Sequence, residues 1–163
     1  MTESGKEALE FLESHGVSYE IAEHERVSSI EECALPMRLL GSLMPRNYFL
    51  TPRNGSVYCL LVAHPSSVFR TSSVSRQAET SRLSFAPEEK VSELLHTFPG
   101  AVSPLGLLFD PEKKIRLLWD KRLESEEFLL FHPLDNRYSV KVKQKELLRA
   151  LDREITRIEM ENE

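Results

Sequence analysis

Residues 46–63 read RNYFLTPRNGSVYCLLVA, two β-rich runs on either side of a turn signal. The runs are residues 48–51 and 57–63, and they bracket Pro-Arg-Asn-Gly at 52–55. An Asn-Gly pair between two such runs is a strong hairpin signal, because the favoured two-residue turn needs positive φ at both positions. The stretch therefore predicts two strands that pair antiparallel.

Helices and strands are interspersed on both sides of this hairpin. The apolar spacing predicts helices at residues 6–15, 74–81, 87–96 and 143–161, and further strands at residues 17–22, 82–85, 115–119, 127–131 and 138–142. A capping box at residues 28–31 predicts another short helix that ends before Pro36. Interspersed, hairpin-connected elements favour one α+β domain over residues 1–163, rather than a doubly wound parallel sheet.

Size and composition place the chain among ordinary globular domains. It has 163 residues, of which 40% are hydrophobic and 29% charged, and a chain of this size buries about 70% of its unfolded surface. No run approaches the ~20 apolar residues of a membrane span, and the polar, acidic N-terminus is unlike a secretion signal. Cys33 and Cys59 are too few for a disulfide framework. We therefore expect a cytoplasmic protein with reduced thiols and no membrane association.

The net charge of −5 is unevenly distributed along the chain. Residues 1–50 hold nine acidic and four basic side chains, whereas residues 51–163 hold seventeen of each. Residues 38–85 contain six arginines against the single acidic Glu79. Arginine suits phosphate and carboxylate recognition better than lysine does. Scattered solvated arginines are the simplest interpretation, and a local basic face that meets the end of a nucleic acid is the alternative.

Familiar catalytic and cofactor motifs are absent from the sequence. It has no phosphate loop, dinucleotide fingerprint, paired-cysteine zinc site or nucleophile elbow. His24, Cys33, Cys59 and His64 do not have the spacing of metal ligands. We therefore expect neither a metal nor another cofactor.

Three segments carry polar groups or fixed backbone geometry that packing alone does not require. Arg46 and Asn47 stand at the start of an apolar strand, and His132 and Asn136 follow another. Residues 98–106, FPGAVSPLG, hold two prolines and two glycines, and such loops can aim free N–H groups at a ligand oxygen. Each segment alone is typical of a turn or a strand cap, but the three together form a family signature.

In this order along the chain, five segments resemble the bacterial prolyl-tRNA editing family. Its members are free-standing relatives of the editing domain inserted in bacterial prolyl-tRNA synthetase, also called YbaK-like domains. The segments are residues 16–24, 46–50, 82–86, 100–110 and 132–136, within a resemblance that covers roughly residues 9–151. Arg46 and Asn47 stand where the family has lysine and asparagine, and residues 100–104 fit its loop of glycine, three residues and proline. Residues 105–110 are typical of the branch that edits alanine.

The resemblance implies a fold, a reaction and a partner. The family fold is a mixed, largely antiparallel sheet flanked by helices. The reaction is hydrolysis of the ester between a wrong amino acid, commonly alanine or cysteine, and the terminal ribose of proline tRNA. Synthetases need such a step because binding alone does not exclude a smaller amino acid well enough. The expected partners are the tRNA acceptor end and, as a further candidate, prolyl-tRNA synthetase.

The resemblance also implies roles for individual residues. Arg46 would bind the terminal ribose-phosphate or the ester carbonyl, and the backbone N–H groups of Gly100, Ala101 and Val102 would stabilise the oxyanion. The expected substrate-binding residues are Asn47, Ser103, Pro104, His132, Asn136 and His24. Of these, Ser103 and Pro104 would shape the loop, and His132 and Asn136 would orient the ribose or amino group.

Two departures from the family pattern leave alternatives open. Arg46 keeps the charge of the family's lysine but does not act as a general base at neutral pH, and Tyr138 is bulky where the alanine branch has smaller residues. The leading interpretation is a trans-editing deacylase for alanyl-tRNA of the proline type. The alternatives are a non-catalytic tRNA- or synthetase-binding module disabled at Arg46, and a hydrolase of small aminoacyl or peptidyl esters.

Overall fold

The computed structural model describes residues 1–27, 29 and 31–162 of the chain. Its helices are α1 (Glu3–Ser14), α2 (Ala34–Leu40), α3 (Thr71–Gln77), α4 (Glu88–Leu95) and α5 (Gln144–Leu151). Its strands are β1 (Tyr19–Glu23), β2 (Arg46–Pro52), β3 (Cys59–Ala63), β4 (Ser67–Val68), β5 (Leu83–Phe85), β6 (Arg116–Asp120), β7 (Phe128–Phe131), β8 (Tyr138–Lys143), β9 (Ile155–Ile158) and β10 (Glu161–Asn162). Short 3₁₀ helices include η2 (Pro99–Ala101) and η3 (Pro104–Phe109). None of the helices in the described chain is long and apolar enough to cross a membrane.

A five-stranded sheet in the order β5-β2-β3-β6-β9 forms the centre of the fold. The predicted hairpin is confirmed: β2 and β3 pair antiparallel, with Arg46 opposite Ala63 and Leu50 opposite Cys59. Gly55 in the connecting turn has a φ of 66°. Strand β6 joins β3 and β9 in parallel, while β1, β8 and β7 form an antiparallel sheet beside the central one. The predicted α+β class, with a mixed and largely antiparallel sheet flanked by helices, is confirmed.

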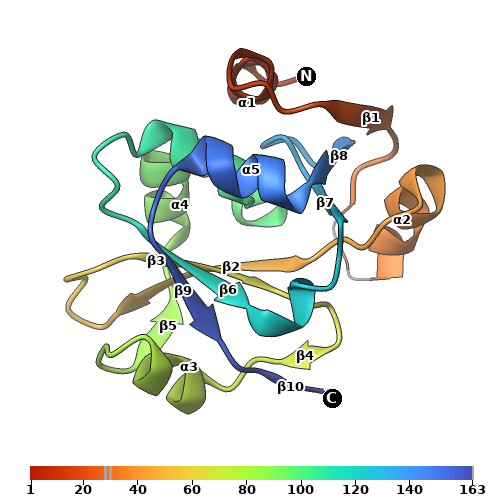
Figure 1. The fold of residues 1–163 in the computed structure, drawn as a ribbon. Coiled ribbons are helices and arrows are strands. Elements are labelled where there is room, and N and C mark those ends of the chain that lie inside the picture. Colours follow the sequence, from red (N-terminus) through yellow and green to blue (C-terminus); the bar gives the residue numbers. More distant parts are fainter. Residues whose placement is uncertain (28, 30, 163) are drawn as a thin grey trace.

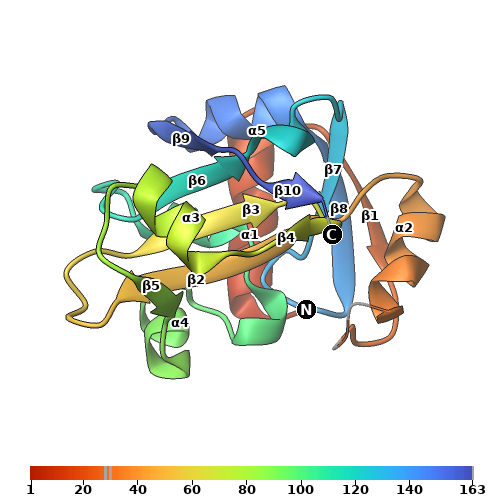
Figure 2. The same ribbon diagram turned by 90° about the horizontal axis from the view of Figure 1, so that it is seen from below.

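Both faces of the central sheet are covered. Figure 1 shows α4 and α5 over one face, and Figure 2 shows α3 with β4 and β10 over the other. Side chains of β3 alternate accordingly: Leu60 and Val62 lie in the larger core with α1, α4 and α5, and Leu61 and Ala63 lie in the smaller core with α3. Two-sided burial explains why this strand is a continuous apolar run.

The predicted C-terminal helix over residues 143–161 is confirmed in its first half by α5 and is wrong beyond Leu151. Helix α5 ends at Leu151, Asp152 adopts a left-handed φ of 46°, and the chain then continues as β9 beside β6. Ile155 packs against the larger core and Ile158 lies in the smaller one. Residues three apart point to opposite faces of a strand, so a strand buried on both faces can mimic a helical apolar stripe.

The other predicted elements are present, with shifted ends. Each predicted strand occurs within two residues of its expected ends, and α1 and α4 confirm the helices predicted at residues 6–15 and 87–96. Helix α3 ends at Gln77 rather than at residue 81, and Glu79 has a φ of 57°. The expected helix end before Pro36 is wrong: helix α2 includes Pro36 in its first turn, where the missing N–H has no helical partner to lose. The predicted capping box at residues 28–31 includes residues 28 and 30, which lie outside the described chain.

A buried ion pair joins η3 and β6 to the chain after α5. Arg153 Nη1 lies 2.8 Å from Asp110 Oδ2, and the two side chains are 5% and 10% exposed. The guanidinium also donates to the Leu107 and Ile115 carbonyls, and the Asp110 carboxylate accepts from the N–H groups of Lys114 and Ile115. This cluster fixes where the chain leaves α5 and enters β9.

We expect Arg153→Leu to lower the free energy of unfolding by about 3–5 kcal/mol, because it leaves the Asp110 carboxylate buried without its counter-charge. The matched control is Arg157→Leu, which breaks an exposed pair with Glu124 and is expected to change stability little. Urea unfolding of both variants measures the difference. Equal losses in the two variants would contradict the role given to the buried pair.

Candidate functional site

A cavity of about 290 Å³ lies where the start of β2 meets η2 and the residue that follows β7. We call it the Arg46 cavity. Its walls bring together five of the ten predicted site residues: Arg46, Asn47, Gly100, Val102 and His132. These residues come from three distant parts of the chain, and the fold brings them together at one cavity.

Two buried polar atoms at this cavity have no partner. Among the described residues, three buried side-chain nitrogen or oxygen atoms lack a hydrogen bond: Arg46 Nε, Asn47 Oδ1 and Arg153 Nε. A buried polar group without a partner costs about 1–3 kcal/mol, so such groups call for an explanation. None of the ion pairs among the described residues involves Arg46. A ligand that offers an acceptor to Arg46 Nε and a donor to Asn47 Oδ1 would satisfy both side chains.

The loop of η2 forms a second wall. Ala101 N–H donates to the Phe98 carbonyl at 2.9 Å, so it is already engaged. Gly100 and Val102 line the cavity, which leaves their N–H groups as the candidate oxyanion donors. A Cβ added at Gly100 would lie 3.1 Å from the Phe98 ring and 3.7 Å from Asn136 Nδ2. The small size of Gly100 therefore lets this loop approach its neighbours closely.

Ser103 and Pro104 are buried behind this loop and do not line the cavity. The Ser103 hydroxyl accepts from the Leu105 N–H at 3.2 Å and so caps η3, with Pro104 at the first position of that helix. These two residues hold the shape of the loop rather than face a ligand.

His132 enters the cavity wall just after β7 and is 8% exposed. Its Nδ1 lies 2.8 Å from the Tyr138 carbonyl, which can only accept, so Nδ1 carries the proton. Burial lowers the pKa of His132 below 6.5; the Tyr138 hydrogen bond opposes this, and the charge of His24 adds to it. The ring is therefore neutral at pH 7, and Nε2 is the acceptor available to a ligand.

His24 and Asn136 do not line the cavity but connect its walls. His24 Nε2 lies 2.8 Å from Ser139 Oγ, and the rings of His24 and His132 are 6.1 Å apart. Asn136 Nδ2 donates to the Val27 carbonyl at 2.8 Å, and the Val27 N–H donates back to the Asn136 carbonyl at 3.0 Å. Val27 is itself a cavity residue, so Asn136 fixes that wall.

Asp135 is a structural residue of the site that the sequence did not single out. It is 2% exposed and accepts hydrogen bonds from the Arg137 side chain and from the N–H groups of Arg137 and Thr2. Burial raises the pKa of Asp135, but these hydrogen bonds outweigh burial and lower the pKa to about 2. The carboxylate thus ties the N-terminus to the loop that carries His132.

Five further residues that line the cavity are not among the predicted site residues: Val27, Cys33, Met44, Tyr48 and Phe131. Cys33 is half-buried; burial and the nearby Glu32 raise the pKa of its thiol, while Arg46 opposes them. The thiol form makes Cys33 a wall of the cavity rather than a nucleophile. Within the described chain, no three His, Cys, Asp or Glu side chains gather as metal ligands would.

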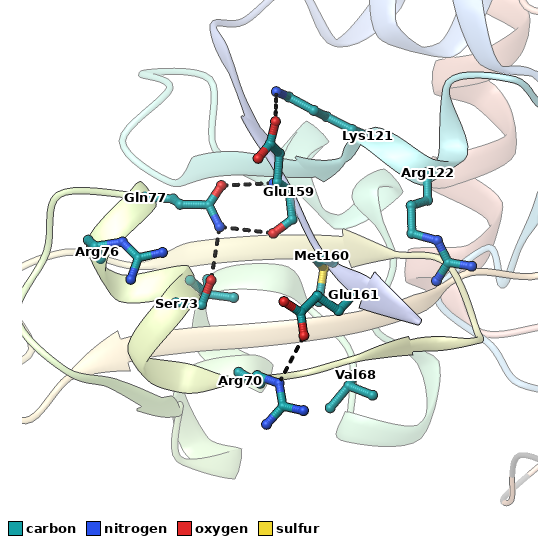
Figure 3. A pocket seen from close by; sticks show the side chains of 11 residues that line it. Val68, Arg70, Ser73, Arg76, Gln77, Lys121, Arg122, Glu159, Met160 and Glu161 are labelled. Atoms are coloured by element: carbon teal, nitrogen blue, oxygen red, sulfur yellow. Dashed lines mark hydrogen bonds and ion pairs between the residues drawn. The ribbon is translucent and has the colours of Figure 1, made fainter. Parts of the chain in front are cut away.

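A larger cavity of about 720 Å³, which we call the α3 groove, lies between α3 and the C-terminal strand (Figure 3). Two of its cations pair with carboxylates: Arg70 Nε lies 3.7 Å from Glu161, and Lys121 Nζ lies 2.9 Å from Glu159. None of the ten predicted site residues is among its described walls. We therefore take the Arg46 cavity as the candidate site.

Known proteins resemble this chain in sequence and in fold. The model of the aminoacyl-tRNA editing domain family matches residues 24–150. The prolyl-tRNA editing protein ProX of Acetoanaerobium sticklandii is 29% identical over 129 residues, which are 79% of this chain and 79% of that protein. The prolyl-tRNA synthetase associated domain-containing protein 1 of Danio rerio is 27% identical over 149 residues, 90% of this chain and 80% of that protein. The crystal structure of a candidate trans-editing enzyme for prolyl tRNA synthetase superposes with a TM-score of 0.77 and 16% identity, covering 100% of this chain and 99% of the other.

We expect His132 to titrate below pH 6.5, with Nδ1 protonated in the neutral form, because burial disfavours the imidazolium. The unfolded state then binds the proton more tightly than the folded state. The stability contribution is complete above pH 6.5 and is lost as the pH falls from there through the folded-state pKa. Nitrogen chemical shifts of the ring measure the titration. A midpoint at or above 6.5, or a stability profile unchanged in His132→Gln, would contradict this account.

Proposed function

Because the chain belongs to the aminoacyl-tRNA editing domain family, we propose that it is a trans-editing deacylase for mischarged tRNA, with alanyl-tRNA of the proline type as substrate. The observation that carries the proposal is the Arg46 cavity, where buried Arg46 Nε and Asn47 Oδ1 lack partners among the residues that the structure describes. The similarity to the prolyl-tRNA editing protein ProX supports the prolyl assignment, and the superposition with the candidate trans-editing enzyme supports the fold. We place the protein in the cytoplasm, where charged tRNAs are used.

We extend the editing domain over residues 1–163, beyond the matched range of 24–150. Two contacts support this extension. Helix α1 contributes Ala8 and Leu12 to the larger core, and β9 adds a strand to the central sheet. Both ends of the chain are thus packed into the same structure as the cavity.

Hydrolysis of an activated ester needs a positioned water, a site for the developing oxyanion and a cation near phosphate. In our proposal, Arg46 binds the ester carbonyl or the phosphate of the terminal nucleotide. The N–H groups of Gly100 and Val102 stabilise the oxyanion that forms when water attacks the carbonyl carbon. The ester C–O bond then breaks, and the products are free alanine and the 3′-terminal ribose hydroxyl.

His132 and Asn47 orient the substrate in this scheme. Neutral His132 presents Nε2 as an acceptor, and Asn47 presents the buried Oδ1. The α-ammonium group of the amino acid and the free ribose hydroxyl are the donors that suit them. In the proposed scheme the two side chains hold the donor groups of the substrate in place by accepting hydrogen bonds from them, and they do not transfer a proton.

The size and walls of the cavity support alanine as the amino acid removed. At about 290 Å³ it is at the small end of ligand pockets, and Met44, Val102 and Phe131 supply apolar walls. A small hydrolytic pocket admits small amino acids and excludes larger ones, which is how a second sieve works. The bulky Tyr138 is not among the described walls, and its carbonyl holds His132.

Arg46 in place of the family's lysine favours a second candidate, a non-catalytic module that binds tRNA or prolyl-tRNA synthetase. An arginine keeps the phosphate contact but offers a planar fork in place of a compact ammonium group. If the reaction requires the ammonium, the fold would bind its partner without cleaving the ester.

We expect the parent and Arg46→Lys to release labelled alanine from alanine-charged proline tRNA, and Arg46→Ala to be slower by about 10- to 100-fold, since a lost charged hydrogen bond costs about 1.5–3 kcal/mol. The matched control is Arg53→Ala, an exposed arginine in the turn after β2, which should leave the rate unchanged.

The other outcomes separate the candidates. An inactive parent with activity restored in Arg46→Lys supports the binding module. No release by either protein contradicts the deacylase on this substrate. Hydrolysis of small aminoacyl esters that uncharged tRNA does not inhibit would support a small-ester hydrolase instead.

A further inference from the structure

Three aromatic rings form a cluster beside the Arg46 cavity. Tyr48 and Phe69 are stacked with ring centroids 5.0 Å apart, and Phe85 lies 6.0 Å from each of them. Tyr48 is also a wall of the Arg46 cavity. We call these three residues the aromatic platform, which is continuous with the cavity through Tyr48.

Core packing accounts for two of the three rings but not for Phe85. Tyr48 and Phe69 pack against the smaller core, whereas Phe85 is 64% exposed on the edge strand β5. A single exposed apolar residue is ordinary. A large exposed ring on a sheet edge is nevertheless a hazard for aggregation, and this one lies beside two further rings, of which Tyr48 is a wall of the Arg46 cavity. The exposed ring of Phe85 is therefore available to stack with a flat ligand.

Positive charge flanks the aromatic platform. Arg46 lies two residues before Tyr48 on β2, so both side chains leave the same face of that strand. Arg70 directly follows Phe69 and pairs with Glu161 (Figure 3). The two side chains of this pair are 61% and 79% exposed. Such an exposed pair is weak in water, so a phosphate can replace Glu161. Aromatic rings beside arginines are how proteins bind single-stranded nucleic acid.

We propose that the aromatic platform stacks the 3′-terminal adenine of the bound tRNA. This inference rests on the proposed function, since it places the base of the same nucleotide whose ribose carries the ester. The Arg46 cavity has room at about 290 Å³ for a small amino acid and the ribose, so the base lies at the mouth, against Tyr48 and Phe85. Arg70 is then positioned for a phosphate of the preceding nucleotides.

The test is equilibrium binding of two uncharged RNAs that differ at one base. One is an acceptor-stem RNA with its terminal adenosine, and the other ends in a ribose without a base. Stacking predicts that the parent binds the first RNA about tenfold more tightly. In Phe85→Ala this preference disappears while binding of the second RNA is unchanged, and Phe85→Trp keeps the preference. Ile21→Ala, which truncates an exposed apolar residue on β1, keeps it as well.

Four outcomes would overturn the inference. The same preference in the parent and in Phe85→Ala would exclude stacking on this ring, and so would no preference in the parent. An equal loss of affinity for both RNAs in Phe85→Ala would mean that Phe85 supports the fold or the position of the nearby arginines instead. Self-association of the parent that Phe85→Ala abolishes, with the preference intact, would make the platform an interface between copies. The RNAs in this test carry no amino acid, so binding is measured independently of hydrolysis. A parent that shows the preference but does not hydrolyse the ester would refute the deacylase and would still support adenine stacking on the aromatic platform.

Discussion

The site depends on the burial of β3 on both of its faces. Leu60 and Val62 must meet the larger core while Leu61 and Ala63 meet the smaller one, so a slip of one residue would exchange the two sets. Pairing of Arg46 with Ala63 follows from that fixed register. The position of Arg46 at the start of β2 is therefore set by hydrophobic packing along the hairpin. A cation can lie half-buried in the wall of this cavity because apolar contacts elsewhere compensate for it.

Local patterns in the sequence were sufficient for elements whose chemistry is local. The Asn-Gly turn between residues 48–51 and 57–63 identified the hairpin, and the expected strands were present. The C-terminal helix failed because Ile155 and Ile158 face opposite cores from one strand, a pattern that depends on partners far away in sequence. Arg153, which reaches back to Asp110, is part of what directs the chain into that strand, and no local pattern records such a contact.

The same distinction applies to the candidate site. The sequence identified Arg46, Gly100 and His132 as unusual, but their meeting in one cavity depends on bonds between distant residues. Asn136 holds the Val27 carbonyl across 109 positions of sequence, and Asp135 holds the Thr2 N–H across 133. A pattern of residue types cannot tell a side chain that faces a ligand from one that fixes a wall.

The unpartnered state of Arg46 indicates what kind of chemistry the site can perform. Arg137, Arg153 and Arg157 all pair with carboxylates in the structure, so the chain has acidic partners available for arginines where stability requires them. Arginine stays protonated at neutral pH, and His132 stays neutral with its proton held by a carbonyl. Arg46 cannot accept a proton, and in the proposed scheme His132 accepts a hydrogen bond through its free Nε2. The rate enhancement in that scheme comes from positioning and from a fixed positive charge. An ester that is already activated is the kind of substrate for which these two effects suffice.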